Sequence, residues 1–274
     1  MIDLHTHTHY SDGRTSPAEL LQAAADRHCS ILAITDHDSV SGVDEALTYA
    51  RTLNIELIPA VEMTTRWDGF MTEVDVLAYF VDIDHAALRQ ALSRNIAGLR
   101  QRVEEITHRL AQKGYAITVQ DVEEQNPRAV SYLSVIHALI KNGCAPDYRT
   151  GAAIFQDALQ DLPLFGIPIQ EGINAIRAAG GVAVLAHPPL IRADPPLSAE
   201  ELAPLIDAGL QGIEILHPSI DAKTHRYYQL LAQKLELVTS GGSDDHGWIN
   251  GFSTLGTQPV TRAMVDALRG ISKQ

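Results

Sequence analysis

The sequence predicts an α/β protein built around a closed or nearly closed barrel. Short apolar segments alternate with amphipathic helical patterns, which is typical of parallel strands joined by helical crossovers. Most of the apolar segments end in a histidine or an acidic residue, as expected where strand ends line a common site. The chain of 274 residues, 45% hydrophobic and 20% charged, is long enough for one large domain or one domain carrying an insertion.

The first part of the chain is expected to form four strands and two helices. Ser16 and Pro17 suit an N-cap and a first helical position, with Glu19 in the first turn. Ser39 is the expected cap of the second helix, and a turn is expected at 67–69. The expected strands are 2–4, 31–35, 55–61 and 73–80, and the expected helices are 17–28 and 43–53.

A helical insertion is expected after the fourth strand. Apolar residues recur at spacings of three and four from Leu88 to Leu110, which predicts a long amphipathic helix ending near Gly114. Helical patterns follow over 130–142 and 148–159. We therefore expect a barrel formed by residues 1–98 and 166–274 and a helical cap domain over residues 99–165. Ordinary barrel helices, with strands that the pattern misses, are the alternative.

Strands and helices alternate again after the insertion. The expected strands are 181–186, 212–216 and 237–240, and the expected helices are 169–179, 197–208, 221–235 and 261–270. This gives seven strand candidates in all, which suits a barrel.

The composition excludes several classes of protein. The formal net charge of −13 argues against a general nucleic-acid-binding surface, so no DNA partner is expected. A small phosphate-bearing substrate stays compatible, because bound cations reverse the field locally. Two cysteines are too few for a disulfide framework or a cysteine-built metal site. With no signal-peptide pattern and no membrane-length apolar run, we expect a cytoplasmic protein without membrane contact. The sequence leaves its oligomeric state open.

Residue types that bind metals follow the predicted strands. His5, His7, His9 and Asp12 lie within eight residues, and alternation along an extended chain points His5 and His7 to one side. A tag-like histidine run is the alternative. The later strand ends carry Asp36, His37, Glu62, His187, His217, Asp244 and His246. Imidazole and carboxylate without thiolate favour Mn²⁺, Zn²⁺ or Fe²⁺ over Ca²⁺, and the number of ligands predicts more than one ion.

In this order, the motifs resemble the PHP (polymerase and histidinol phosphatase) family of the amidohydrolase superfamily. The resemblance runs from residue 2 to about 252 and rests on His5-Thr6-His7, Thr35-Asp36-His37-Asp38, Glu62, Ala186-His187-Pro188 and Gly242-Ser243-Asp244-Asp245-His246. It implies a distorted (β/α)7 barrel with a two- or three-metal phosphoesterase site. The implied ligands are His5, His7, Glu62 and Asp244 for one metal and Asp12, His37 and His246 for another.

The third metal position departs from the family pattern. By the resemblance, Glu62 bridges to a further ion that is also bound by His187 and by a histidine on the fourth strand, where this chain has Asp75. We favour two Mn²⁺ ions, with three ions, or Zn²⁺, Fe²⁺ or Mg²⁺, as alternatives. With two ions, His187 is free to act on the substrate.

The insertion and the segment Glu214-Ile215-Leu216-His217-Pro218-Ser219 resemble the TrpH-like branch, whose members are 3′,5′-nucleoside bisphosphate phosphatases. We therefore hypothesise removal of the 3′-phosphate to give a nucleoside 5′-monophosphate, by attack of a hydroxide that bridges two metals. His187 or His217 is the expected general acid.

Residues of the insertion and of the first loop are expected to contact the rest of the substrate. The branch usually carries an Arg-Pro-His step in the insertion, whereas the aligned segment here reads Ser131-Tyr132-Leu133-Ser134. The expected substrate-binding residues are Arg14, Arg128, Ser134 and His137, and Tyr132 and Trp248 are candidates for stacking on a base.

Three other functions stay open from the sequence. Some members of the branch trim short 5′-phosphorylated RNA from its end, so a 5′-3′ exonuclease with short RNA as partner is one alternative. A histidinol-phosphate type of small phosphomonoesterase is a second. A catalytically inactive metal-binding module is the third, although only Asp75 departs from the ligand pattern.

Overall fold

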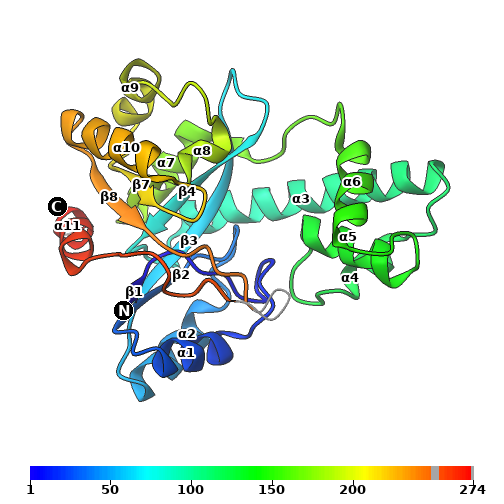
Figure 1. The fold of residues 1–274 in the computed structure, drawn as a ribbon, viewed down its shortest axis with the longest axis horizontal. Helices are drawn as coiled ribbons and strands as arrows, with labels where there is room; N and C mark the ends of the chain where they lie inside the picture. The colour runs from blue at the N-terminus through cyan, green and yellow to red at the C-terminus, as the bar shows by residue number, and fades with distance from the viewer. Residues whose placement is uncertain (248–252, 273–274) are drawn as a thin grey trace.

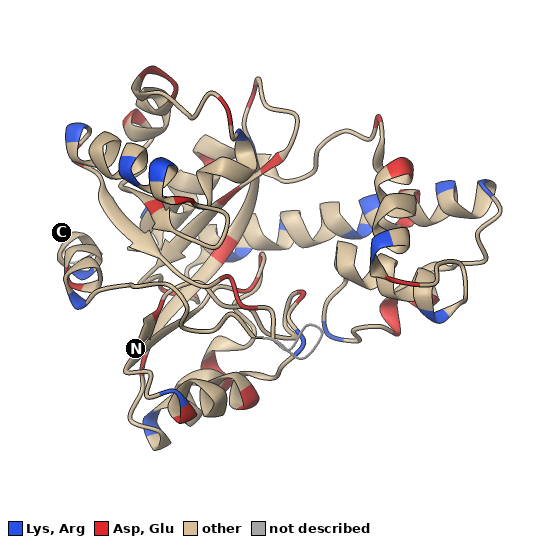
Figure 2. Cartoon of the chain, in the orientation of Figure 1, with Lys and Arg blue, Asp and Glu red and all other residues tan. Residues whose placement is uncertain are grey.

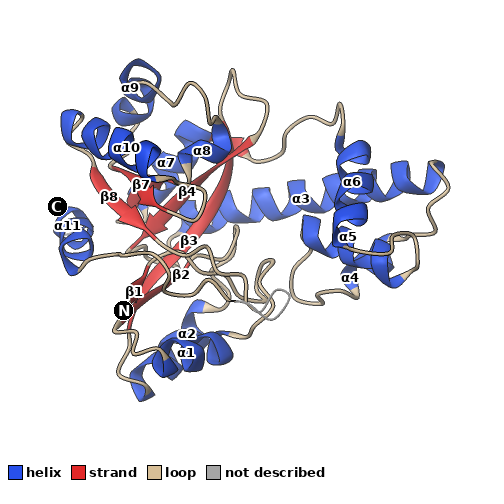
Figure 3. Cartoon of the chain, viewed as in Figure 1, coloured by secondary structure: helices blue, strands red, loops and turns tan. Residues whose placement is uncertain are grey.

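The computed structural model describes residues 1–247 and 253–272 and shows one sheet surrounded by helices, with a helical arm projecting to one side (Figure 1, Figure 3). The strands are β1 (Ile2–Asp3), β2 (Ile31–Ile34), β3 (Glu56–Arg66), β4 (Glu73–Tyr79), β5 (Ile167–Pro168), β6 (Val182–Leu185), β7 (Gly212–Leu216) and β8 (Val238–Gly241). Their order is β1-β2-β3-β4-β6-β7-β8, with β5 paired to β3. A parallel bridge between Thr6 and Asp245 links the segments that follow β1 and β8. The sheet is therefore a nearly closed barrel, and the predicted α/β class is confirmed.

The predicted helices are present, and two short ones were not expected. The helices are α1 (Pro17–Asp26), α2 (Val43–Thr52), α3 (Ala86–Gln112), α4 (Val119–Glu123), α5 (Tyr132–Lys141), α6 (Tyr148–Leu159), α7 (Ile169–Ala178), α8 (Pro188–Ile191), α9 (Ala199–Asp207), α10 (Ala222–Lys234) and α11 (Arg262–Ser272). Ser16 and Glu19 form a capping box at α1, as expected. The expectation for Ser39 was wrong: α2 begins after Gly42 without a side-chain cap, and the Ser39 hydroxyl accepts from the Ser41 N–H instead.

The third and fourth strands differ from the prediction in length and direction. β3 continues through Glu62 to Arg66, so Glu62 lies inside the strand and not at its end. β4 is antiparallel to both β3 and β6, and Asp75 lies opposite Thr64. The connection from Trp67 is short, and a parallel crossover needs a dozen or more residues. The hairpin therefore places Asp75 beside the metal-ligand residues from the opposite strand direction.

Helix α3 takes part in two hydrophobic cores. Its first turns bury Leu88 and Leu92 in the barrel core, which also contains residues of β4 and α7. Its second half buries Ile106 and Leu110 in a separate core that is otherwise formed by residues 117–158. Figure 1 shows this half of α3 with α4, α5 and α6 standing apart from the sheet, and we call these elements the arm. The division at 98/99 and 165/166 stays a prediction, and its first boundary falls within α3.

Charge is distributed unevenly over the fold. Figure 2 shows acidic positions on the central strands, on the loops at their ends and on the outer helices, and basic positions mainly on the outer helices. Across the described part of the chain, no helix is long and apolar enough to cross a membrane.

Candidate metal centre

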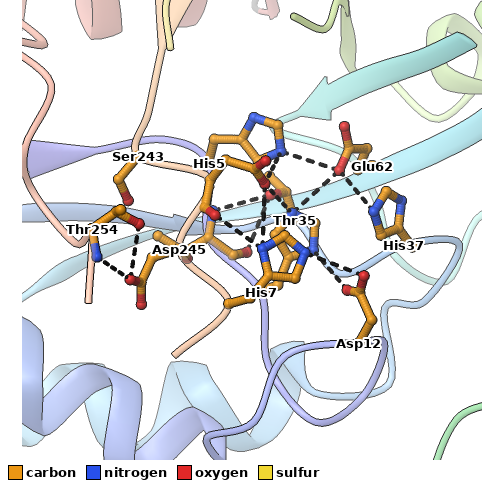
Figure 4. A network of polar contacts seen from close by, with 12 residues as sticks. His5, His7, Asp12, Thr35, His37, Glu62, Ser243, Asp245 and Thr254 are labelled. Carbon is orange, nitrogen blue, oxygen red and sulfur yellow. Dashed lines mark hydrogen bonds and ion pairs between the residues drawn. The ribbon is translucent and has the colours of Figure 1, made fainter. Parts of the chain in front are cut away.

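Four side chains from separate parts of the sheet meet in the first ligand cluster. His5 and His7 come from the segment after β1, Glu62 from the middle of β3, and Asp244 from the segment after β8. His5 Nε2 lies 3.1 Å from Glu62 Oε2 and 3.3 Å from Asp244 Oδ1. His7 Nε2 lies 3.3 Å and 3.0 Å from the same two oxygen atoms. Two imidazole nitrogens and two carboxylate oxygens thus lie close together, and Figure 4 shows His5, His7 and Glu62 of this cluster.

A second cluster shares His7 with the first. It contains Asp12, His37 and His246, whose candidate ligand atoms lie within 4.8 Å of one another together with His7. His246 Nε2 is 3.2 Å from Asp12 Oδ2, and the His7 and His246 rings stack at 4.2 Å between centroids. The group contains the three residues that the resemblance implied for a second metal, together with His7, and metal binding by them stays a prediction.

A third group forms around the other oxygen of Glu62. His187 Nε2 lies 2.9 Å from Glu62 Oε1 and 3.9 Å from Asp75 Oδ2. His37, Glu62 and Asp75 also offer three ligand atoms within 4.8 Å of one another. The structure therefore brings Asp75 to the centre, in the place where the family pattern has histidine.

Close contacts between histidines and carboxylates shift the pKa values of the centre. Burial lowers the pKa of His37, but Glu62 and Asp12 raise it to about 9. Burial likewise lowers the pKa of His246, and Asp12 raises it to about 10. Burial raises the pKa of Glu62, yet the nearby His5 and His37 hold it well below its usual range. Since a metal binds the deprotonated nitrogen, metal binding here displaces protons.

Glu214 on β7 supports two ligand residues at once. Its side chain is fully buried. Oε1 accepts from His5 Nδ1 at 3.1 Å, which leaves His5 Nε2 directed at the first cluster. Oε2 accepts from the backbone N–H of His187 at 2.8 Å, where the chain has the unusual φ of +24°. Glu214 therefore fixes a ring orientation and a strained backbone together.

His217 is arranged to orient Asp244. Its Nδ1 accepts from the Ser219 N–H at 3.0 Å, so Nε2 carries the proton and faces Asp244 Oδ2 at 3.2 Å. Ser219 Oγ lies 2.7 Å from the same Nδ1.

Two acidic residues of the sequence motifs accept hydrogen bonds from neighbouring loops. Asp36 accepts from the Thr8 N–H and Oγ1 at 2.6 Å each and from Ser11 Oγ at 2.8 Å, which holds the loop that carries Asp12. Asp245 accepts from the Thr254 N–H at 2.6 Å and from the Gly247 N–H at 3.1 Å (Figure 4). His9, which had no predicted role, lies outside the ligand clusters that the described residues form.

Two cavities lie between the centre and the helical arm. The larger, of about 400 Å³, is lined by residues that include Asp12, His37, Asp75, His187 and Arg128. The smaller, of about 360 Å³, is lined by residues that include Asp12, Arg14, Ser134 and His137. The Arg14 guanidinium donates to His137 Nε2 at 2.7 Å, whereas the Arg128 guanidinium lies 5.3 Å from the centroid of the Tyr10 ring. His217 lines neither cavity, and Trp248 lies outside the described residues.

Comparison with known proteins identifies the family. The model of the PHP domain matches residues 3–124. A 3′,5′-nucleoside bisphosphate phosphatase of Chromobacterium violaceum is 30% identical over 256 residues, which cover 89% of this chain and 87% of the relative. The chain belongs to the PHP family.

Other PHP relatives carry different activities. A 5′-3′ exoribonuclease of Haemophilus influenzae is 29% identical over 90% of this chain and 91% of its own. A phosphoribosyl 1,2-cyclic phosphate 1,2-diphosphodiesterase of Eggerthella lenta is 29% identical over 89% of this chain and 94% of its own. A metal-dependent phosphoesterase structure from Bifidobacterium adolescentis superimposes with a TM-score of 0.87 at 27% identity, covering 98% of this chain and 96% of that one. This PHP protein is a metal-dependent phosphoesterase.

The residues present fit divalent metal ions. Both ring nitrogens of His7 are buried and make no hydrogen bond among the described residues, although carboxylate oxygens lie close to Nε2. A buried imidazole without a hydrogen bond is costly unless another ligand binds it. The nitrogen and carboxylate donors are hard or borderline ligands, which suit Mn²⁺, Zn²⁺, Fe²⁺ or Mg²⁺.

The residues that hold the candidate ligands in place were not predicted from the sequence. No role was predicted for Glu214. An acidic residue between Ile213 and Ile215 in a buried strand is nevertheless a signal of a buried polar contact. Asn126 was not singled out, yet its amide donates to the backbone carbonyls of His9 and Ser11 at 3.0 Å each. This contact joins the arm to the loop that carries Asp12, and nothing in the local sequence indicates it.

Proposed function

We propose that this phosphoesterase hydrolyses the 3′-phosphate of nucleoside 3′,5′-bisphosphates to give nucleoside 5′-monophosphates. The observation that carries the proposal is the pair of cavities meeting at Asp12, one lined by ligand residues and the other by Arg14 and His137. A substrate with two phosphates needs two separate anion contacts, and these cavities offer them side by side. The bisphosphate phosphatase of C. violaceum among its relatives supports the same substrate.

In this proposal two ions are held by the two main clusters. One is held by His5, His7, Glu62 and Asp244 and the other by Asp12, His37 and His246, with Mn²⁺ as the expected metal. Divalent ions in these positions supply Lewis acidity toward the phosphoryl oxygens and an activated water. The protein is expected to work in the cytoplasm on a small nucleotide.

The side chains that line the cavities have separate tasks. His187 lines the larger cavity, so it is the proposed donor of the proton that the departing 3′-oxygen requires. His217 lines neither cavity and instead holds Asp244, which makes it a positioning residue in this scheme. The Arg14 guanidinium offers paired N–H donors to the second phosphate, with His137 and Ser134 beside it. Arg128 lines the larger cavity on the side of the arm.

Phosphate release by the Mn²⁺-loaded protein tests the proposal. The panel contains adenosine 3′,5′-bisphosphate, 5′-AMP, cyclic AMP and histidinol phosphate. We expect a kcat/KM for the bisphosphate at least 100-fold above that for the others. The Arg14→Ala variant should raise KM for the bisphosphate, while the exposed Arg149→Ala on α6 serves as the matched control. Release from none of these compounds would refute the proposal.

A second candidate is a 5′-3′ exoribonuclease acting on short 5′-phosphorylated RNA. The exoribonuclease of H. influenzae among its relatives favours it, and so does the room that two adjoining cavities give to a longer substrate. A 5′-phosphorylated pentanucleotide separates the two candidates. Mononucleotide release from that RNA, at a kcat/KM above that for the bisphosphate, would favour the exoribonuclease.

A further inference from the structure

The larger cavity is lined by two chemically different sets of residues. The barrel contributes candidate ligand residues, and the arm contributes apolar and aromatic side chains that include Leu99, Tyr132 and Phe165, which we call the apolar end of the cavity. The Tyr132 and Phe165 rings meet edge to face at 6.0 Å between centroids. A nucleotide with its phosphate at the ligand residues would direct its planar base toward this apolar end. A cavity of about 400 Å³ is large enough for such a ligand.

Polar atoms without hydrogen bonds lie within this apolar wall. Glu73 precedes Asp75 by two residues on β4, so both side chains point to one face, about 7 Å apart along the strand. Both residues line the cavity. Glu73 Oε1 and the Tyr132 hydroxyl are buried and make no hydrogen bond in the described structure. Behind them, the buried Arg102 of α3 forms an ion pair with Glu73, with Nη2 at 3.5 Å from Oε1, and it also lies close to the Tyr132 side chain.

These atoms define the chemistry of a complementary ligand. A carboxylate only accepts hydrogen bonds, whereas a tyrosine hydroxyl both donates and accepts. Burial, followed by the Glu73 charge, raises the pKa of Tyr132, so the hydroxyl keeps its proton. The group that fits is therefore an N–H donor with no carbonyl on the adjacent ring atoms. The exocyclic amino groups of adenine, cytosine and guanine meet this condition, whereas the ring N–H groups of hypoxanthine and uracil lie beside a carbonyl oxygen. A carbonyl oxygen placed against Glu73 would instead meet a negative charge.

We infer that the apolar end of the larger cavity binds the nucleobase of the substrate and selects bases that present an exocyclic amino group to Glu73, with Tyr132 beside it. This inference rests on the proposed action on nucleotides. It assigns a specificity-determining role to Glu73 and Tyr132 and a supporting one to Arg102. The chain would prefer adenine, cytosine or guanine nucleotides to those of hypoxanthine and uracil.

Binding of three product nucleotides tests the inference without relying on turnover. Calorimetric titration of the Mn²⁺-loaded protein with AMP, GMP and IMP is informative, because hypoxanthine lacks the amino group of both adenine and guanine. Since hydrogen bonds to charged groups are strong, AMP or GMP should bind roughly 10- to 100-fold more tightly than IMP. Equal affinities for all three nucleotides would overturn the inference.

Variants identify the source of the preference. In Glu73→Gln the amide offers either an acceptor or a donor to the base, so the ratio of affinities should fall to within about threefold. Tyr132→Phe removes one oxygen atom and keeps the ring, and it should lower the ratio even if Glu73→Gln folds poorly. Glu105→Gln, on the exposed side of α3, is the matched control and should keep the wild-type ratio. An unchanged ratio in both Glu73→Gln and Tyr132→Phe would also overturn the inference.

The inference and the proposed function fail in different ways. An amino-group preference in binding, together with no phosphate release from bisphosphates, would refute the proposed function alone. Phosphate release that proceeds with the same KM for adenosine and inosine bisphosphates, together with equal nucleotide affinities, would refute the inference alone.

Discussion

Replacing Glu214 by leucine should weaken metal binding although Glu214 lies outside the first ligand cluster. The change removes the acceptors of His5 Nδ1 and of the His187 N–H, at 3.1 Å and 2.8 Å. Loss of a partner that orients a ligating histidine typically costs 10- to 100-fold in metal affinity. Each buried donor left without an acceptor costs about 1–3 kcal/mol, so the free energy of unfolding should fall by about 2–6 kcal/mol in total.

Two measurements separate these effects. Competition with a fluorescent chelator gives the Mn²⁺ affinity, and thermal unfolding with and without chelator gives the stability. Glu214→Gln keeps one carbonyl oxygen and should lie between the wild type and Glu214→Leu in both. Glu104→Leu, at an exposed position of α3, is the control for a lost carboxylate. Wild-type Mn²⁺ affinity in a folded Glu214→Leu variant would refute the reasoning.

Three further predictions concern the proton donor, the pH dependence and a helix cap. His187→Asn should lower kcat by about 10²- to 10⁴-fold while elemental analysis finds the wild-type metal content; loss of an ion would make His187 a ligand instead. The histidines His37 and His246, with pKa values of about 9 and 10, stabilise the metal-free fold fully below pH 6.5, and this contribution is lost as the pH rises through 9 and 10. The chelator-treated protein should therefore have a lower Tm at pH 10 than at pH 7, whereas Mn²⁺ should bind more tightly as the pH rises; a flat Tm profile would contradict this. Ser16→Ala removes the capping box of α1 and should cost about 1 kcal/mol in chemical denaturation, with Ser272→Ala near the chain end as control.

The candidate ligand residues could be proposed from the sequence, because their residue types and their order along the chain are read directly from it. His5 and His7 alternate on one extended segment, and His37 directly follows an apolar strand. Their convergence follows from the sheet, since adjacent strands bring their ends together. Glu62 was found as a ligand candidate for an incorrect reason, because β3 runs on past it.

The antiparallel direction of β4 could have been predicted from the sequence. The hydrogen bonds that hold the candidate metal centre in place could not. The turn after Trp67 leaves too few residues for a parallel crossover, so the antiparallel pairing of β3 and β4 was implicit in the chain length between them. The contact of Glu214 with His5 joins residues 209 positions apart. The link of Asn126 to His9 crosses from the arm to the barrel. Such pairings depend on tertiary packing, which no local pattern encodes.

Helix α3 connects the arm to the barrel as one continuous helix. Twenty-seven helical residues span about 40 Å, and one continuous rod joins the two cores. A tilt of about 5° at its barrel end displaces the far end by roughly 3 Å, which is close to the thickness of a nucleobase. At the barrel end, Asn95 donates to Asp38 Oδ1 and to the Thr64 carbonyl, each at 2.7 Å, and Asp38 directly follows the candidate ligand His37. The barrel end of α3 thus adjoins the candidate metal centre, so a tilt of this helix would change both the width of the larger cavity and the contact of Asn95 with Asp38.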